Sequence, residues 1–407
     1  MTTTGTAVEC GVEAVPPADG LRSARRAFHY FLLITAFHGI LGRLVGYFLP
    51  VYFRDLGFSG VQTGLYFSVS TIATLLLSLP MGISTDRKSI AGIFMFASFL
   101  GAVSYLGLIF TRSFAVFCGF ALIGSIGGRF YGTANNSMFF KISRHEDGHD
   151  TGVYQLISFV STGLGMLTGS LIIAAASFRH MFIAACLGNV VLIGLSYFLP
   201  RTETVVIRLH EYRKEVLTPR VLFITFVFML SSVHWGAESI SYGRFLMENL
   251  GLTVRQTGLY TSVGFVVVGL GAYLGVVLLR YRILRDLQAV LMLGFLLAGV
   301  FHVLMCVRNP WLSFSLRMVH ELGDGLVFLA YYNGIAKIFH VNKIGGCAAF
   351  MSLCTGIASM ASAVLFGWVG DRWGHQWPLI ISGIVMALLP VLLAVSRHKI
   401  SEPATAA

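Results

Sequence analysis

The chain has 407 residues, of which 56% are hydrophobic and only 12% are charged. A soluble globular protein carries about 25% charged residues, so this composition excludes an ordinary soluble domain and indicates an integral membrane protein. The formal net charge is +11, but the basic residues lie in short connections between apolar runs. A nucleic-acid-binding protein would gather them on one soluble face. We therefore expect the lipid bilayer and a small molecule as partners, and no nucleic acid.

Residues 1–26 contain Pro16, Pro17 and scattered polar residues without an apolar core or cleavage site, which predicts a short N-terminal tail and not a signal peptide. Twelve apolar runs follow. Each is long enough to cross a bilayer and must be helical there, because lipid does not satisfy irregular backbone. The runs are 27–53, 60–84, 90–111, 114–140, 152–177, 181–199, 221–246, 256–279, 287–307, 311–337, 345–369 and 377–396. The predicted fold class is an all-α membrane protein with twelve transmembrane helices.

The distribution of Lys and Arg predicts how these helices are oriented. If the N-terminus is cytoplasmic, 19 of the 29 Lys and Arg residues fall in inner segments and 7 fall in outer segments. Basic residues concentrate on the cytoplasmic side of membrane proteins. We therefore expect a cytoplasmic (inner or plasma) membrane protein, with the N-terminal tail and the tail at 397–407 both in the cytoplasm.

A polar linker at 200–220 divides the chain into halves at 27–199 and 221–396, and the two halves repeat. The sequence LGFSGVQTGLYFSV at 56–69 aligns with LGLTVRQTGLYTSV at 250–263, at an offset of 194 residues. Two six-helix bundles related by pseudo-symmetry are typical of transporters whose binding site lies between the repeats. We expect the protein to act as a monomer.

The connection after the second run reads Gly82-Ile-Ser-Thr-Asp86-Arg87-Lys88. Together with twelve runs in two halves, this Gly-x-x-x-Asp-Arg pattern resembles the major facilitator superfamily over nearly the whole chain. The resemblance implies that Gly82, Asp86, Arg87 and Lys88 form a cytoplasmic gating motif that interlocks with a neighbouring helix end. The later Gly and the final basic pair of that motif are missing, and the corresponding Asp is lost in the second half.

Ionisable residues inside the predicted spans are the main signal for a functional site. Each costs on the order of 2.5–3.5 kcal/mol at the centre of a membrane helix, so such residues face a protein interior or a wet cavity. The spans that contain them are the first, fourth, seventh and tenth, which line the central path in the family that the chain resembles. The residues are His38, Arg43, Arg129, His234, Glu238, Arg317, His320, Glu321 and Asp324.

The four ionisable residues of the tenth span, Arg317, His320, Glu321 and Asp324, are spaced i, i+3, i+4 and i+7 and therefore share one helix face. Two neighbouring carboxylates repel each other, so one of the two carboxyl groups resists ionisation. A carboxyl group that holds its proton in this way is what proton coupling requires. We expect Glu321 or Asp324, and then Glu238, to carry the proton, with His320 as a relay. The alternative is a static network of ion pairs that holds the helices in register.

Arginine side chains bind carboxylate or phosphate through two parallel hydrogen bonds. Arg43, Arg129 and Arg317 therefore favour an anionic or zwitterionic substrate, unless each is matched by one of the acidic residues. Further substrate contacts are predicted from four polar side chains in the same four spans. These are His38, His234, Asn136 and Tyr242.

Two further expectations come from His302 and the glycines. We interpret His302 as a histidine at the membrane interface, outside the site. The pairs Gly165–Gly169 and Gly271–Gly275 allow close approach of helices. The resemblance implies that the fifth and eighth spans, which carry these pairs, pack across the two halves, and ordinary tight packing would explain the pairs as well. The six cysteines have no metal-ligand spacing, and the loops contain no nucleotide or nucleophile motif. We predict no metal, no cofactor and no enzymatic activity.

The sequence thus favours a proton-coupled secondary transporter that moves a small organic, anionic solute across the membrane by alternating access. One alternative is a proton-antiporting exporter of drugs or amphiphiles, which the many Phe and Met residues favour. Another is a membrane sensor or assembly factor on the same scaffold that transports nothing.

Overall fold

The computed structural model describes residues 18–46, 48–143, 148–200, 202, 204 and 207–396. Within these residues the secondary structure is helical, without strands. The first part of the chain forms α1 (Ala18–Gly46), α2 (Leu49–Asp55), α3 (Gly60–Arg87), α4 (Ile90–Phe110), α5 (Phe114–Ile142), α6 (His149–Ala175), α7 (Phe178–Tyr197) and α8 (Leu209–Val216). The second part forms α9 (Pro219–Ala237), the π-helical turns η1 (Glu238–Tyr242) and η2 (Phe245–Asn249), α10 (Val254–Arg280), α11 (Leu287–Leu304), α12 (Pro310–Ile338), the short η3 (Val341–Lys343), α13 (Ile344–Trp373) and α14 (Gln376–Val395).

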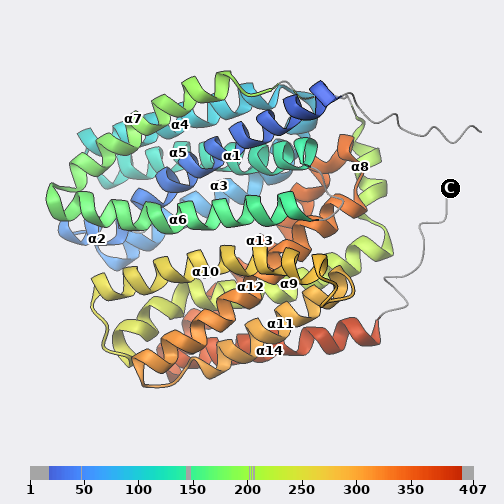
Figure 1. Cartoon of the computed structure of the whole chain (residues 1–407). Coiled ribbons are helices and arrows are strands. Elements are labelled where there is room, and N and C mark those ends of the chain that lie inside the picture. The colour runs from blue at the N-terminus through green and yellow to red at the C-terminus, as the bar shows by residue number, and fades with distance from the viewer. Residues whose placement is uncertain are drawn as a thin grey trace, which may run out of the picture.

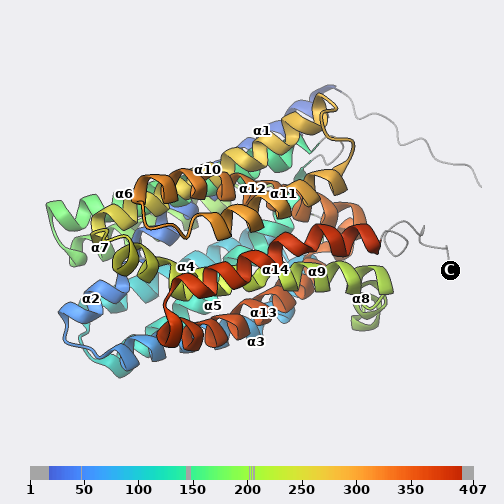
Figure 2. The ribbon, with the colours of Figure 1, turned by 90° about the horizontal axis from the view of Figure 1, so that it is seen from below.

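The long helices run side by side between two ends of the molecule. In Figure 1, α1 to α7 form the upper bundle and α9 to α14 the lower one. The start of α1, the end of α14 and the short helix α8 lie at one end, and α2 lies at the opposite end (Figures 1 and 2). We call these the α8 end and the α2 end.

The predicted membrane fold is confirmed, with twelve long helices in the described residues. Ten helices are long and apolar enough to cross a membrane by length and composition. The other two are α3 and α12, which are as long as their neighbours but more polar. In α12 the reason is the set of charged residues that marks the predicted site.

Four element boundaries differ from the predicted ones. Helix α1 begins at Ala18, inside the predicted tail, and α8 forms inside the predicted linker. The first predicted span is divided into α1 and α2, with Pro50 in the first turn of α2, where a missing N–H costs no helical hydrogen bond. The seventh span changes from α-helix to π-helix at Glu238. The remaining residues of both tails lie outside the described residues.

The repeat seen in the sequence has a structural counterpart at the start of α3 and of α10. Ser59 and Gln62 form a capping box at the first helix, and Thr253 and Gln256 form the same box at the second. The side chain of each Ser or Thr accepts a hydrogen bond from the Gln backbone N–H, and the Gln side-chain oxygen accepts one from the backbone N–H of the Ser or Thr, so two N–H groups are satisfied. Gly57 and Gly251, also 194 residues apart, both adopt positive φ just before the box.

The predicted contact between the fifth and eighth spans is present, because α6 packs along α10. The two glycine pairs, however, do not form it. Gly165 and Gly169 contact α1 at Ile40 and Leu44, whereas Gly271 and Gly275 contact α12. These small residues therefore bring helices together within each bundle, which agrees with the alternative of ordinary tight packing.

Candidate functional site

A cluster of buried charged side chains lies between α9, α11 and α12, inside the second bundle. At its centre Arg317 donates through Nε to Oε1 of Glu321 at 2.6 Å and contacts the Glu238 carboxylate through Nη1. The guanidinium also lies 4.2 Å from the centre of the Tyr242 ring, a cation–π contact. Arg317 therefore joins two carboxylates from different helices.

Next to this group, two histidines lie against the third carboxylate. His234 Nε2 is 3.2 Å from Oδ2 of Asp324, and His320 Nε2 is 3.6 Å from the same oxygen. His320 Nε2 is also 3.3 Å from Oε1 of Glu238. The cluster thus contains every ionisable residue that the sequence singled out on the seventh and tenth spans. His234 and Glu238 each contact α12.

His302 belongs to the cluster and was misassigned to the membrane interface. Its side chain is fully buried, its Nδ1 lies 3.4 Å from Oε1 of Glu238, and its ring centre is 4.6 Å from that of His320. It is the single ionisable residue of α11, which otherwise reads as a uniformly apolar helix. The signal in the sequence was a lone histidine in an otherwise apolar span, and in the structure it faces the ionisable residues of α12.

The charges in the cluster do not balance when all the histidines are neutral. Three ionised carboxylates carry −3 and Arg317 carries +1, which leaves −2. The side chains of Arg317, Glu321 and Asp324 are no more than 9% exposed, and Glu238 is the most open at 17%. Because an unbalanced buried charge is unstable, the cluster requires about two further positive charges.

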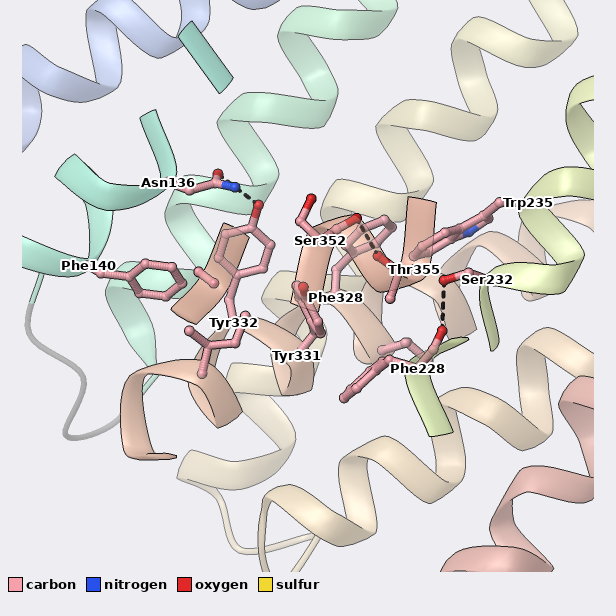
Figure 3. Close-up of a pocket in the computed structure, with 13 residues that line it drawn as sticks. Asn136, Phe140, Phe228, Ser232, Trp235, Phe328, Tyr331, Tyr332, Ser352 and Thr355 are labelled. Atoms are coloured by element: carbon pink, nitrogen blue, oxygen red, sulfur yellow. Dashed lines mark hydrogen bonds between the residues drawn. The ribbon is translucent and has the colours of Figure 1, made fainter. Parts of the chain in front are cut away.

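A separate cavity of about 170 Å³ lies between the two bundles, with walls from α5, α9, α12 and α13. Figure 3 shows Asn136 and Phe140 on one side, and Ser232 and Trp235 on the other. Asn136 accepts hydrogen bonds from the hydroxyls of Tyr332, at 3.0 Å, and Tyr154, at 3.2 Å. The lining combines aromatic rings with hydroxyl and amide groups, as small-molecule sites do.

The predicted substrate residues are thus not brought to a single site. Arg129 donates to Oγ of Ser352, a residue of the cavity wall, at 3.3 Å. Arg43 lies 5.6 Å over the ring of Phe265 on α10, and His38 stacks on Tyr131 inside the first bundle. Arg129 thus contacts a residue of the inter-bundle cavity wall, while Arg317 lies in the charged cluster.

The predicted gating motif contacts both α13 and α8 at the α8 end. Asp86, which is buried, accepts hydrogen bonds from the backbone N–H groups of Gly345 at 3.1 Å and Gly346 at 2.9 Å, at the start of α13. A helix N-terminus favours a negative charge at this place. Tyr212 of α8 donates to the same carboxylate at 3.0 Å. Burial and the Asp86 charge raise the pKa of Tyr212, so its hydroxyl stays a donor.

The other three motif residues have different surroundings. Gly82 faces α13 so closely that a Cβ atom would lie 2.7 Å from the carbonyl oxygen of Gly345. Arg87 donates to the carbonyl oxygen of Ile207 in the linker. Lys88 is exposed and ends α3. The motif therefore connects the first bundle, the linker and the second bundle.

Twelve long helices, a polar cavity between two bundles and a buried charged cluster together define a membrane transporter. The chain belongs to the Major Facilitator Superfamily, whose sequence pattern matches residues 31–285 and 224–406. A search of curated proteins by sequence returned no match.

Two solved structures have a similar fold. One is the human organic anion transporter MFSD10 (TETRAN), with a TM-score of 0.70 and 16% identity, over 93% of this chain and 100% of that one. The other is a bacterial homologue of the iron transporter ferroportin in an outward-facing state, with a TM-score of 0.69 and 14% identity, over 92% and 99%. At these identities the similarity concerns the fold.

Proposed function

We propose that the protein is a proton-coupled secondary transporter that moves a small organic anion across the cytoplasmic membrane by alternating access, with the α8 end in the cytoplasm. The observation that carries this proposal is the charge of the buried cluster. Glu238, Glu321 and Asp324 outnumber the single permanent cation, Arg317, and three histidines lie among them.

Two bound protons would make this cluster neutral. Protons on His234 and His320, the two rings against Asp324, would each replace a repulsive contact by a charge-assisted hydrogen bond. Losing them would leave a charge of −2 in a dry interior, which is unstable unless the helices move and admit water. Proton loss and helix movement are therefore coupled in this proposal.

The cavity between the bundles is the proposed substrate site. It is built from both halves of the chain, as alternating access requires, and Arg129 provides a cation at the wall through Ser352. Aromatic side chains would hold the organic part of the substrate, and Arg129 would hold its negative group. The human relative with the same fold is described as an organic anion transporter, which agrees with this choice.

Contacts at the α8 end support a rocking motion of the bundles. Asp86 holds the start of α13 through two backbone hydrogen bonds. Breaking these contacts would open the cavity toward the α8 end, and reforming them would close it. Such a gate opens only when the lost hydrogen bonds are replaced, for instance by water.

The experiment is transport by the purified protein in proteoliposomes with an internal pH-sensitive dye. Aromatic carboxylates such as benzoate and salicylate would be compared with a lipophilic cationic dye such as ethidium. The proposal expects carboxylate-dependent proton movement that saturates with solute concentration. Proton movement with ethidium alone would instead identify the second candidate, an amphiphile exporter, which Phe140, Phe228 and Phe328 in the cavity wall favour. No flux with any solute would support a non-transporting sensor or assembly factor.

A further inference from the structure

We propose that His234, His320 and Asp324 form a binding site for one divalent transition-metal ion, with Glu238 and His302 as adjacent donors. The ligand atoms of the first three residues lie within 4.8 Å of one another, as do those of Glu238, His302 and His320. The inference deepens the proposed function, since it names a second occupant for the same cluster. Binding itself can be measured without transport.

The first argument is the orientation of the two imidazole rings. Nδ1 of His320 lies 2.7 Å from the backbone carbonyl oxygen of Ala298, and Nδ1 of His234 contacts that of Ser231. A carbonyl oxygen can only accept, so each Nδ1 carries the hydrogen. In the neutral rings, Nε2 of both histidines therefore presents a lone pair. Holding a histidine by its second nitrogen in this way is the usual support for a metal ligand.

Both lone pairs are directed at a negatively charged oxygen. His234 Nε2 and His320 Nε2 lie 3.2 Å and 3.6 Å from Oδ2 of Asp324. Two neutral rings would repel this oxygen, so positive charge must lie between the three atoms. Either a proton on each ring or one metal ion supplies it.

The distances suit a metal ion. Bonds of about 2.0–2.1 Å from a tetrahedral zinc ion place neighbouring ligand atoms roughly 3.3 Å apart. The contacts of His234 and His320 with Asp324, at 3.2 Å and 3.6 Å, lie on either side of this value. The contacts of His320 and His302 with Glu238, at 3.3 Å and 3.4 Å, are close to it. The histidine-to-carboxylate distances thus match the spacing of neighbouring ligand atoms around a tetrahedral ion.

The negative charge of the cluster matches the positive charge of one divalent ion. Arg317 neutralises one of its two carboxylate partners, Glu238 or Glu321, and the cluster as a whole retains −2 when its histidines are neutral. A single divalent ion would remove this charge, as two protons would. The two occupants are therefore alternatives for one cluster.

Several ligand atoms in the cluster make no hydrogen bond of good geometry, although His320 Nε2 and His302 Nδ1 lie close to the Glu238 carboxylate. They are both ring nitrogens of His302, Nε2 of His320 and Oδ1 of Asp324, and these three side chains are at least 94% buried. Buried polar atoms normally have a partner, so such a concentration at one place indicates a missing ligand. An ion held by His234, His320 and Asp324 would give Nε2 of His320 a partner, and an ion held by Glu238, His302 and His320 would also give one to a ring nitrogen of His302.

The donor set selects the kind of metal. Imidazole nitrogen with carboxylate oxygen suits Zn²⁺, Co²⁺, Fe²⁺ and Ni²⁺, whereas Mg²⁺ and Ca²⁺ prefer oxygen ligands and Cu⁺ prefers sulfur. The sequence predicted no metal site because the cysteines lack ligand spacing, and the three proposed ligands come from α9 and α12, which are far apart in the chain. Only the i, i+4 spacing of His320 and Asp324 is local.

Metal binding to the purified full-length protein tests this inference. After removal of metal with EDTA, we expect wild-type protein in detergent to bind one equivalent of Zn²⁺ by calorimetry. Co²⁺ should show the visible absorption of a four-coordinate ion, and Mg²⁺ should not compete. His234→Ala and Asp324→Asn should each weaken Zn²⁺ binding at least 10- to 100-fold. His180→Ala removes an exposed histidine far from the cluster and should bind like wild type.

Folding of each variant is monitored by its elution as a single species and by its thermal transition without metal. His320→Gln serves as a second ligand variant if His234→Ala does not fold. Wild-type protein that binds no Zn²⁺, or ligand variants that bind like His180→Ala, would overturn the metal site while leaving proton-coupled transport in liposomes intact. Conversely, one equivalent of Zn²⁺ lost in the ligand variants supports the site even if no proton flux is found.

Discussion

The guanidinium of Arg317 contacts the carboxylate of Glu238 although 79 residues separate them in the chain. This contact joins α12 to the point where α9 changes into the π-helical turn η1. π-helical turns are frequent at functional sites. The pair therefore links the backbone irregularity of one helix to the charged face of another.

Arg317→Leu should destabilise the protein strongly. Removing one member of a buried ion pair leaves the other without a partner and costs about 3–5 kcal/mol, and here two carboxylates lose theirs. The matched control is Arg244→Leu, because Arg244 pairs with Asp371 at 2.9 Å where both side chains are exposed. An exposed pair contributes about 1 kcal/mol or less. Thermal unfolding in detergent checks the difference, and equal transitions for the two variants would contradict the assigned role.

Gly82→Ala should disturb closure at the α8 end, because its methyl group would meet the backbone of α13. Gly92→Ala on α4 is the matched control, since no neighbouring atom lies within 4 Å of its Cβ position. The reporter is a cysteine in the cavity wall, Ser352→Cys, which is labelled with a thiol reagent added from the α8 end. We expect its labelling to be faster with Gly82→Ala than without it, and unchanged with Gly92→Ala. Unchanged labelling would argue against this packing as a closing contact.

Tyr212→Phe should loosen the linker helix without unfolding the bundles. The change removes the hydrogen bond to Asp86, which is worth about 1.5–3 kcal/mol because the acceptor is charged. Since the raised pKa of Tyr212 keeps the hydroxyl protonated, the difference between wild type and variant should not vary between pH 6 and 9. Limited proteolysis of the linker measures the loosening. A difference that disappears within this pH range would mean that the contact depends on another group.

Arg129→Gln should raise KM for an anionic solute by tenfold or more and change kcat less. Arg129 contacts Ser352 in the cavity wall, so its charge would act on bound substrate. Arg43→Gln is the comparison, because Arg43 lies over Phe265 and does not line the cavity. Initial uptake rates at several solute concentrations separate KM from kcat. A larger KM change for Arg43→Gln would place the substrate elsewhere.

Much of the architecture could be predicted from local patterns. Apolar runs predict membrane helices because lipid allows little else. The shared Gln-Thr-Gly-Leu-Tyr predicted a repeat, and in the structure α3 and α10 both begin with a capping box at this sequence. The i, i+3, i+4, i+7 spacing on α12 predicted its charged face, and all four residues lie in the cluster.

The failures concern contacts between distant segments. The π-helical turn at Glu238 has no local sequence signal, and the position of His302 depends on how α11 rotates against α12. The sequence placed Arg43, Arg129 and Arg317 around a single cavity because their spans correspond to the helices that line the central path in the family. The position of a residue in such a span does not fix the direction of its side chain, and these three side chains point to different places.

The central claim is that the buried cluster exchanges protons during transport, and proton flux through the Glu321→Gln variant tests it most directly. Glutamine keeps the size of the side chain, and Arg317 keeps its contact with Glu238, so the variant should fold and still bind solute. Because this change lowers the charge of the cluster with neutral histidines from −2 to −1, the account predicts that solute-driven proton movement in proteoliposomes falls by about half, while Glu248→Gln, which alters an exposed carboxylate, transports normally. Undiminished proton movement with an unchanged pH profile in Glu321→Gln would contradict the claim.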